Sequence, residues 1–180
     1  MMKCLIFIVF FSISFGVIAK LPEHVLHPNG TKFILCSENK ITKAIFFDVV
    51  RVGLYLEHCD TLNPIFSTSN KLVRFHYLRE VTGKQFTEGA TEYLTLNLTN
   101  EQYSKCFEQY QVVNNSYVDV SDGDYYDLFY FSNSGLDLYL NNKSIGQLKN
   151  DDCELPYFKI WFGEKSMDSG FRKLLRNYSK

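Results

Sequence analysis

The stretch Phe-Phe-Asp-Val-Val-Arg-Val-Gly-Leu-Tyr-Leu-Glu, residues 46–57, is dense in aromatic, β-branched and leucine side chains. With the residues just before it, this stretch predicts a strand over 43–57, and its length and β-branching are typical of a central strand. A shorter apolar segment at 31–37 predicts a neighbouring strand. Beyond a loop that contains Pro64, residues 71–78 predict a third strand.

Two amphipathic helices are predicted next, over residues 83–97 and 100–112, because apolar side chains recur there at helical spacing. The apolar positions are Phe86, Ala90, Tyr93 and Leu94 in the first helix, and Tyr103, Cys106, Phe107 and Tyr110 in the second. Each helix is therefore expected to bury one face against the sheet.

Three further strands are predicted after a turn at residues 121–124. They cover residues 125–131, 136–140 and 144–148. The links between them are rich in Ser, Asn and Gly, which are typical of hairpin turns, and a meander of this kind forms an antiparallel sheet.

Two short helices are predicted to end the chain. The first begins at a cap formed by Asp151 or Asp152 and reaches Trp161, and the second is capped by Ser166. The order of strands, helix pair, strands and helix pair predicts an α+β fold.

Four segments in the right order carry a resemblance that covers most of the chain after residue 19. They are residues 46–57, residues 75–104, the run Asn-Asn-Lys-Ser-Ile-Gly at 141–146, and the run Ile-Trp-Phe-Gly at 160–163 with Leu174 and Leu175 beyond it. Together they resemble chalcone isomerases and their exported bacterial relatives, the chalcone isomerase-like proteins. The resemblance implies one domain over residues 20–180, with an antiparallel β-sheet covered on one face by a layer of helices.

The same resemblance bears on catalysis. Plant chalcone isomerases organise the substrate oxyanion and an ordered water with an arginine, a threonine and a tyrosine. The resemblance places the tyrosine at Tyr103, an asparagine position at Tyr110, the threonine position at Val50 and the arginine position at Thr42. Losing one pre-aimed donor costs about 10²–10³ in rate, so efficient isomerisation is not expected. Tyr103 is the candidate catalytic residue if the protein is an enzyme.

We expect Tyr103, Tyr110, Val50 and Thr42 to form the ligand-binding site. The seven-residue spacing of the two tyrosines keeps both on one helical face, and we predict that they flank Val50 in one concave, apolar site. The chain has 16 Phe and 12 Tyr, which favours a packed core that includes such a pocket.

The amino terminus has the features of a secretory signal peptide over residues 1–19. Lys3 precedes an apolar run from Cys4 to Ile18, and the small residue Ala19 predicts cleavage before Lys20. The alternative is an uncleaved membrane anchor, but the run is shorter than the roughly 20 residues that a bilayer needs. We therefore expect an exported protein, periplasmic in a bacterium and otherwise secreted, with no stable membrane insertion after cleavage.

Composition argues against a nucleic-acid-binding protein, and the cysteine content allows disulfides. The chain has 19 basic and 20 acidic residues, and removing Lys3 changes the formal charge from −1 to −2, with no basic stripe to favour nucleic acid. The four cysteines beyond residue 19 are Cys36, Cys59, Cys106 and Cys153, which allow three disulfide connectivities. We expect no cofactor and no metal.

Three functions remain open from the sequence. The first is non-catalytic binding of a small apolar or amphipathic ligand, such as a fatty acid, between the sheet and the helices. The second is an isomerase or intramolecular lyase that acts on an unknown enone. The third is an envelope scaffold or interaction protein whose cleft is filled by its own aromatic side chains.

Overall fold

The computed structural model describes residues 20–43, 47–60, 63–149 and 152–178. The predicted signal peptide lies outside these residues. No helix in the described part is both long and apolar enough to cross a membrane.

A seven-stranded antiparallel sheet forms the centre of the molecule, and its strands follow one another in sequence order. They are β1 (His24–Leu26), β2 (Lys32–Lys43), β3 (Phe47–Leu56), β4 (Lys71–Tyr77), β5 (Tyr125–Phe131), β6 (Gly135–Leu140) and β7 (Lys143–Leu148). The predicted strands are therefore present, with residue 43 in β2 rather than at the start of β3. The three-residue strand β1 was missed because it is too short to show a period and lies beside prolines.

Two helices lie on the connection between the paired strands β4 and β5: α1 (Gly83–Asn97) and α2 (Asn100–Asn114). Each begins with a capping box, Thr82 with Gln85 and Thr99 with Gln102, which satisfies backbone N–H groups at the helix start. Just outside them, Val81 and Val120 form an isolated antiparallel bridge that closes this long connection.

Three helices follow the sheet: α3 (Glu154–Tyr157), α4 (Lys159–Phe162) and α5 (Ser169–Tyr178). The single short helix predicted to reach Trp161 is thus divided at Phe158. Of the two predicted caps, Asp151 lies outside the described residues, and Asp152 does not cap the helix: Cys153 precedes α3, and the Asp152 carboxylate pairs with Lys105. At the start of α5 the carboxylate of Asp168, not Ser166, accepts the N–H of Gly170 at 2.6 Å.

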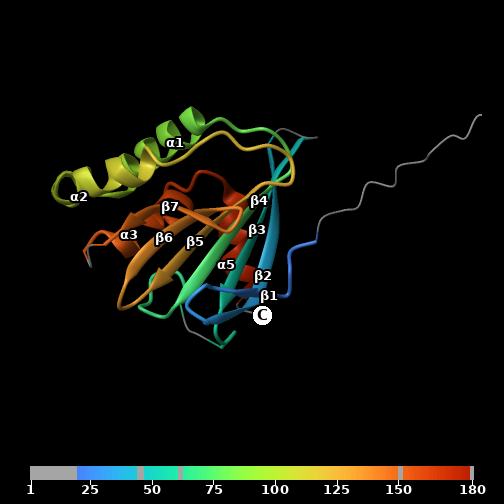
Figure 1. Ribbon diagram of the computed structural model, residues 1–180. Helices are drawn as coiled ribbons and strands as arrows, with labels where there is room; N and C mark the ends of the chain where they lie inside the picture. Colours follow the sequence, from blue (N-terminus) through green and yellow to red (C-terminus); the bar gives the residue numbers. More distant parts are fainter. Residues whose placement is uncertain (1–19, 44–46, 61–62, 150–151, 179–180) are drawn as a thin grey trace, which may run out of the picture.

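The helices cover one face of the sheet, and residues of the β1–β2 hairpin pack on the other face. α5 packs on β2 and β3, and α2 packs on β7 (Figure 1). α1 contacts α4. Alternate residues of β3, from Val50 through Val52 and Leu54, are buried in the large core on the helical face. On the opposite face Phe33 and Phe129 belong to a smaller aromatic core.

Two disulfides join segments that are distant in sequence. Cys36 of β2 is bonded to Cys59, just after β3, and Cys106 of α2 is bonded to Cys153, just before α3. The second bond fixes α2 to the carboxy-terminal helices. Of the three connectivities that the sequence allows, this is the one formed.

Candidate functional site

A cavity of about 330 Å³ lies between the helical face of the sheet and the helices α1, α4 and α5. Val50, Tyr77 and Leu138 line it from the sheet, and Ala90 and Trp161 line it from the helices. This volume is within the range of small-ligand sites, and most of its walls are aliphatic or aromatic. The site can therefore hold an apolar molecule of modest size.

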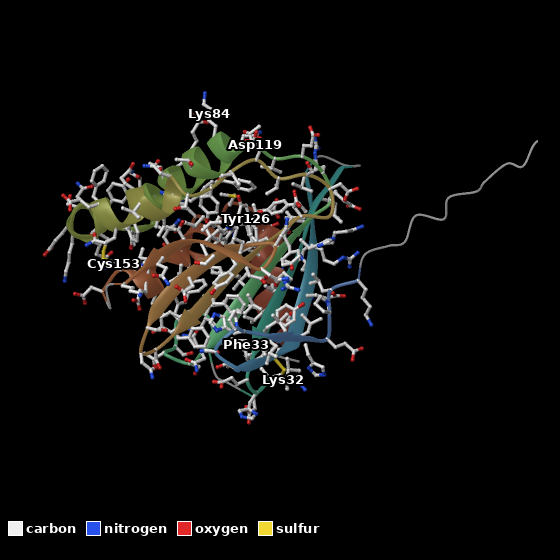
Figure 2. The ribbon with its side chains drawn as sticks, viewed as in Figure 1. Lys32, Phe33, Lys84, Asp119, Tyr126 and Cys153 are labelled. Carbon is white, nitrogen blue, oxygen red and sulfur yellow. A yellow bond between two sulfur atoms is a disulfide. The ribbon has the colours of Figure 1, made fainter. Side chains whose placement is uncertain are left out.

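Two tyrosine hydroxyls in the cavity wall are held by the protein itself. The Tyr126 hydroxyl donates to the Val118 carbonyl at 2.8 Å and accepts the Val118 N–H at 3.0 Å. Figure 2 shows Tyr126 between the sheet and α1. The Tyr117 hydroxyl lies 3.3 Å from that of Tyr157, which donates to the Asn114 side-chain oxygen at 2.8 Å. These bonds fix the orientation of the rings around the cavity.

The Tyr77 hydroxyl differs from these two. Tyr77 lies at the end of β4, directly opposite Val50 of β3, and its side chain is 6% exposed. Its ring packs against Phe86 at 5.3 Å and Tyr126 at 5.9 Å between centroids. No residue in the described part of the chain hydrogen-bonds the hydroxyl, and the oxygen is not among the polar atoms sealed in the packing. Burial raises the pKa of Tyr77 well above its usual value, so the hydroxyl keeps its proton.

The charged groups of the cavity are at its rim. Arg79 and Glu80 follow β4 and are exposed, and Asp168, half-buried, precedes α5. Gln85 also lies at this rim, where its side chain caps α1. Among the residues that the structure describes, the rim therefore carries one basic and two acidic side chains, whereas the buried lining residues are uncharged.

Of the residues expected to bind ligand, Val50 lines the cavity and Thr42 does not. Thr42 is exposed next to a bulge between β2 and β3, and its hydroxyl donates to the Asp48 carboxylate at 2.8 Å. Asp48 also pairs with Lys40 at 2.6 Å. Thr42 thus belongs to a small surface network of polar side chains.

The prediction that Tyr103 and Tyr110 flank Val50 is wrong. Neither lines the cavity, because α2 lies over β7, across the sheet from β3. Tyr110 is fully buried, and its hydroxyl donates to the Cys153 carbonyl at 3.0 Å. Tyr103 is half-buried with its ring 6.3 Å from that of Tyr110, and Cys153 lies well away from Tyr126 in Figure 2.

Tyr77, Tyr126 and Trp161 were missed as site residues. Tyr77 follows Val73 and Phe75 on the alternating face of a predicted strand, so its inward direction was visible in the sequence. The position of Tyr77 opposite Val50 could not be read from the sequence, because the register between two strands depends on residues that are distant in sequence.

The comparison with protein families agrees with this architecture. The family model described as chalcone isomerase-like matches residues 38–175. The chain belongs to the chalcone isomerase-like family. The predicted fold, an antiparallel sheet covered on one face by helices, is confirmed.

Among solved structures, the chain is similar to the crystal structure of a fatty-acid binding protein of Arabidopsis thaliana. The TM-score is 0.61 at 14% sequence identity, and the match covers 87% of this chain and 98% of the plant chain. At this identity the likeness shows the fold alone. A comparison with curated protein sequences found no significant match.

Proposed function

We propose that this member of the chalcone isomerase-like family is an exported, non-catalytic protein that binds a small apolar or amphipathic molecule, such as a fatty acid. The cavity of about 330 Å³ carries this proposal. A scaffold whose cleft is filled by its own side chains would have no such space, so the cavity favours binding over the scaffold function. The solved relative from Arabidopsis thaliana is described as a fatty-acid binding protein, which supports the ligand class.

The proposed binding site keeps Val50 and adds Tyr77, Tyr126 and Trp161. Thr42, Tyr103 and Tyr110 are left out of the proposed binding site because they lie outside the cavity lining.

The proposal that isomerisation is inefficient rests on the same geometry. Val50 brings no donor to the cavity, and the hydroxyls of Tyr117 and Tyr126 are already engaged with protein groups. Among the described tyrosines that line the cavity, this leaves the Tyr77 hydroxyl as a single donor in place of the several that isomerisation needs. Stabilising an oxyanion requires donors aimed at the developing charge, with a large loss of rate when one is missing.

We propose export through cleavage of residues 1–19, with the mature protein in the periplasm of a bacterium or secreted. Two disulfides support this location, because such bonds persist in oxidising compartments and are rare where thiols are kept reduced. Intact-mass measurement of the protein from an exporting host tests it. A mass that retains residues 1–19 would contradict the cleavage.

The test of ligand binding is native mass spectrometry of the purified protein, followed by denaturing extraction and identification of any co-purified molecule. Ala90, 3% exposed in the cavity wall, is replaced by phenylalanine to fill the cavity, and the matched control is Leu96→Phe at an exposed position of the same helix. We expect a bound small molecule in the wild type and in Leu96→Phe, and its loss in Ala90→Phe.

A second readout covers the case in which the ligand is lost during purification. Trp161 is the only tryptophan in the chain and lines the cavity, so its fluorescence reports occupancy. An unchanged Trp161 spectrum and thermal midpoint across a fatty-acid and alkane panel, with nothing extracted, would refute binding and favour the scaffold function.

A further inference from the structure

The Tyr77 hydroxyl points to a more specific ligand than an apolar chain alone. It is a hydrogen-bond donor on a side chain that lines the cavity and is more than nine-tenths buried, with no partner in the part of the chain that the structure describes. Buried polar groups are nearly always paired, and leaving a donor against a hydrocarbon tail is unfavourable. A ligand that fills the cavity should therefore present an acceptor atom to Tyr77.

The charge of the site limits what that acceptor can be. Among the described residues of the cavity lining, Arg79 is the one basic side chain, and it is exposed. The lining also includes two acidic side chains, Glu80 and Asp168. The residues that the structure places against Tyr77 are uncharged: Val50 lies opposite it, and the rings of Phe86 and Tyr126 pack on its ring. A carboxylate bonded to Tyr77 would be buried without a cation, which is far more costly than burying a neutral carbonyl.

We propose that the cavity binds its ligand in an uncharged form, with a carbonyl oxygen accepting a hydrogen bond from the Tyr77 hydroxyl. This inference rests on the proposed binding function and names the chemistry of the same site: an ester, a ketone or a protonated acid rather than a fatty-acid anion. The Val50 side chain has no hydroxyl. Tyr77, directly opposite it on the neighbouring strand, supplies one.

The experiment uses three probes and the fluorescence of Trp161. Methyl nonanoate and decanoic acid are isomers, one an ester and the other a carboxylate at pH 7.5, and decane has no acceptor. We expect methyl nonanoate to bind at least about tenfold more tightly than decanoate at pH 7.5. Decanoic acid should gain at least about tenfold in affinity at pH 5.5, because its protonated fraction rises near a carboxyl pKa of about 4–5. The ester should show the same affinity at both pH values.

Tyr77→Phe removes the hydroxyl and keeps the ring. It should weaken methyl nonanoate binding about 3- to 10-fold, the worth of one neutral hydrogen bond, and leave decane unchanged. Tyr139→Phe is the matched control, because Tyr139 packs against Phe129 on the opposite face of the sheet. It should change none of the affinities.

The outcomes separate this inference from the proposed function. Decanoate that binds as tightly as the ester at pH 7.5, or equal effects of Tyr77→Phe on the ester and on decane, would overturn the inference while binding itself stands. Failure of all three probes to bind, decane included, would refute the proposed function and the inference with it.

Discussion

Lys71 tests how a buried charged group affects stability on the helical face of the sheet. It is fully buried at the start of β4, its amine donates to the Ser67 carbonyl at 2.6 Å, and it lies 4.1 Å from the centre of the Tyr130 ring. Burial lowers the pKa of Lys71 from 10.5 to about 7. We expect Lys71→Met, which keeps an unbranched apolar chain of similar length, to stabilise the protein at neutral pH.

The magnitude follows from the pKa. One pKa unit is worth about 1.4 kcal/mol, so a pKa lowered to about 7 opposes folding at neutral pH by at most about 4–5 kcal/mol. The substitution also loses the bond to Ser67, worth about 1.5–3 kcal/mol for a charged donor. The net increase in the free energy of unfolding is therefore expected to be about 1–3 kcal/mol near pH 7.

The pH dependence has a definite sign. Because the folded pKa of Lys71 is below the unfolded one, the unfolded chain binds more protons between about pH 7 and 10.5, and wild-type stability should rise through this window. The stability of Lys71→Met should lack this rise. The difference in the free energy of unfolding between the variant and the wild type should therefore shrink as the pH increases.

Urea unfolding at pH 6, 7.5 and 9 measures both quantities. Lys32→Met, at an exposed position of β2, is the control and should change stability by less than about 0.5 kcal/mol at every pH. The reasoning is refuted if Lys71→Met destabilises the protein throughout, or if its stability rises with pH as steeply as that of the wild type.

Three further predictions concern covalent, ionic and catalytic properties. Replacing both Cys106 and Cys153 by alanine should lower the free energy of unfolding by about 2–4 kcal/mol, measured by thermal unfolding, and reductant should then affect the variant less than the wild type. Asp127→Asn should cost about 3–5 kcal/mol in urea unfolding, because the buried Arg74 guanidinium loses its counter-charge and one of its two 2.6 Å bonds. Asp48→Asn, in an exposed pair, should destabilise the protein much less. Purified protein should show no chalcone cyclisation above background in an absorbance assay, and a measurable enzyme-dependent rate would contradict the non-catalytic proposal.

Much of the fold was predictable because its signals are local. The apolar periodicity of α1 and α2 placed both helices within two residues of their observed ends. The capping boxes at Thr82 and Thr99 are local signals of the same kind. The turns between β5, β6 and β7 are indicated by their Asn and Gly residues, three of which, Gly135, Asn141 and Asn142, have positive φ.

The site was less predictable because it depends on which elements meet. Helical periodicity correctly indicates that Tyr110 is buried, but it does not say against which strand. The Cys106–Cys153 disulfide and the contact with β7 hold α2 away from β3. The same periodicity placed Phe107 on the buried face, whereas its side chain is 47% exposed.

The bridge between Val81 and Val120 has a consequence for the divergence of ligand specificity. The helices α1 and α2 both belong to the connection between the adjacent strands β4 and β5. Insertions, deletions or exchanges between these two valines therefore leave the pairing of β4 with β5 intact. Surface connections on a rigid scaffold tolerate such change well. Under the proposed binding function, a lineage can therefore change its ligand preference by altering the cavity-lining positions of α1, while the pairing of β4 with β5 is inherited unchanged.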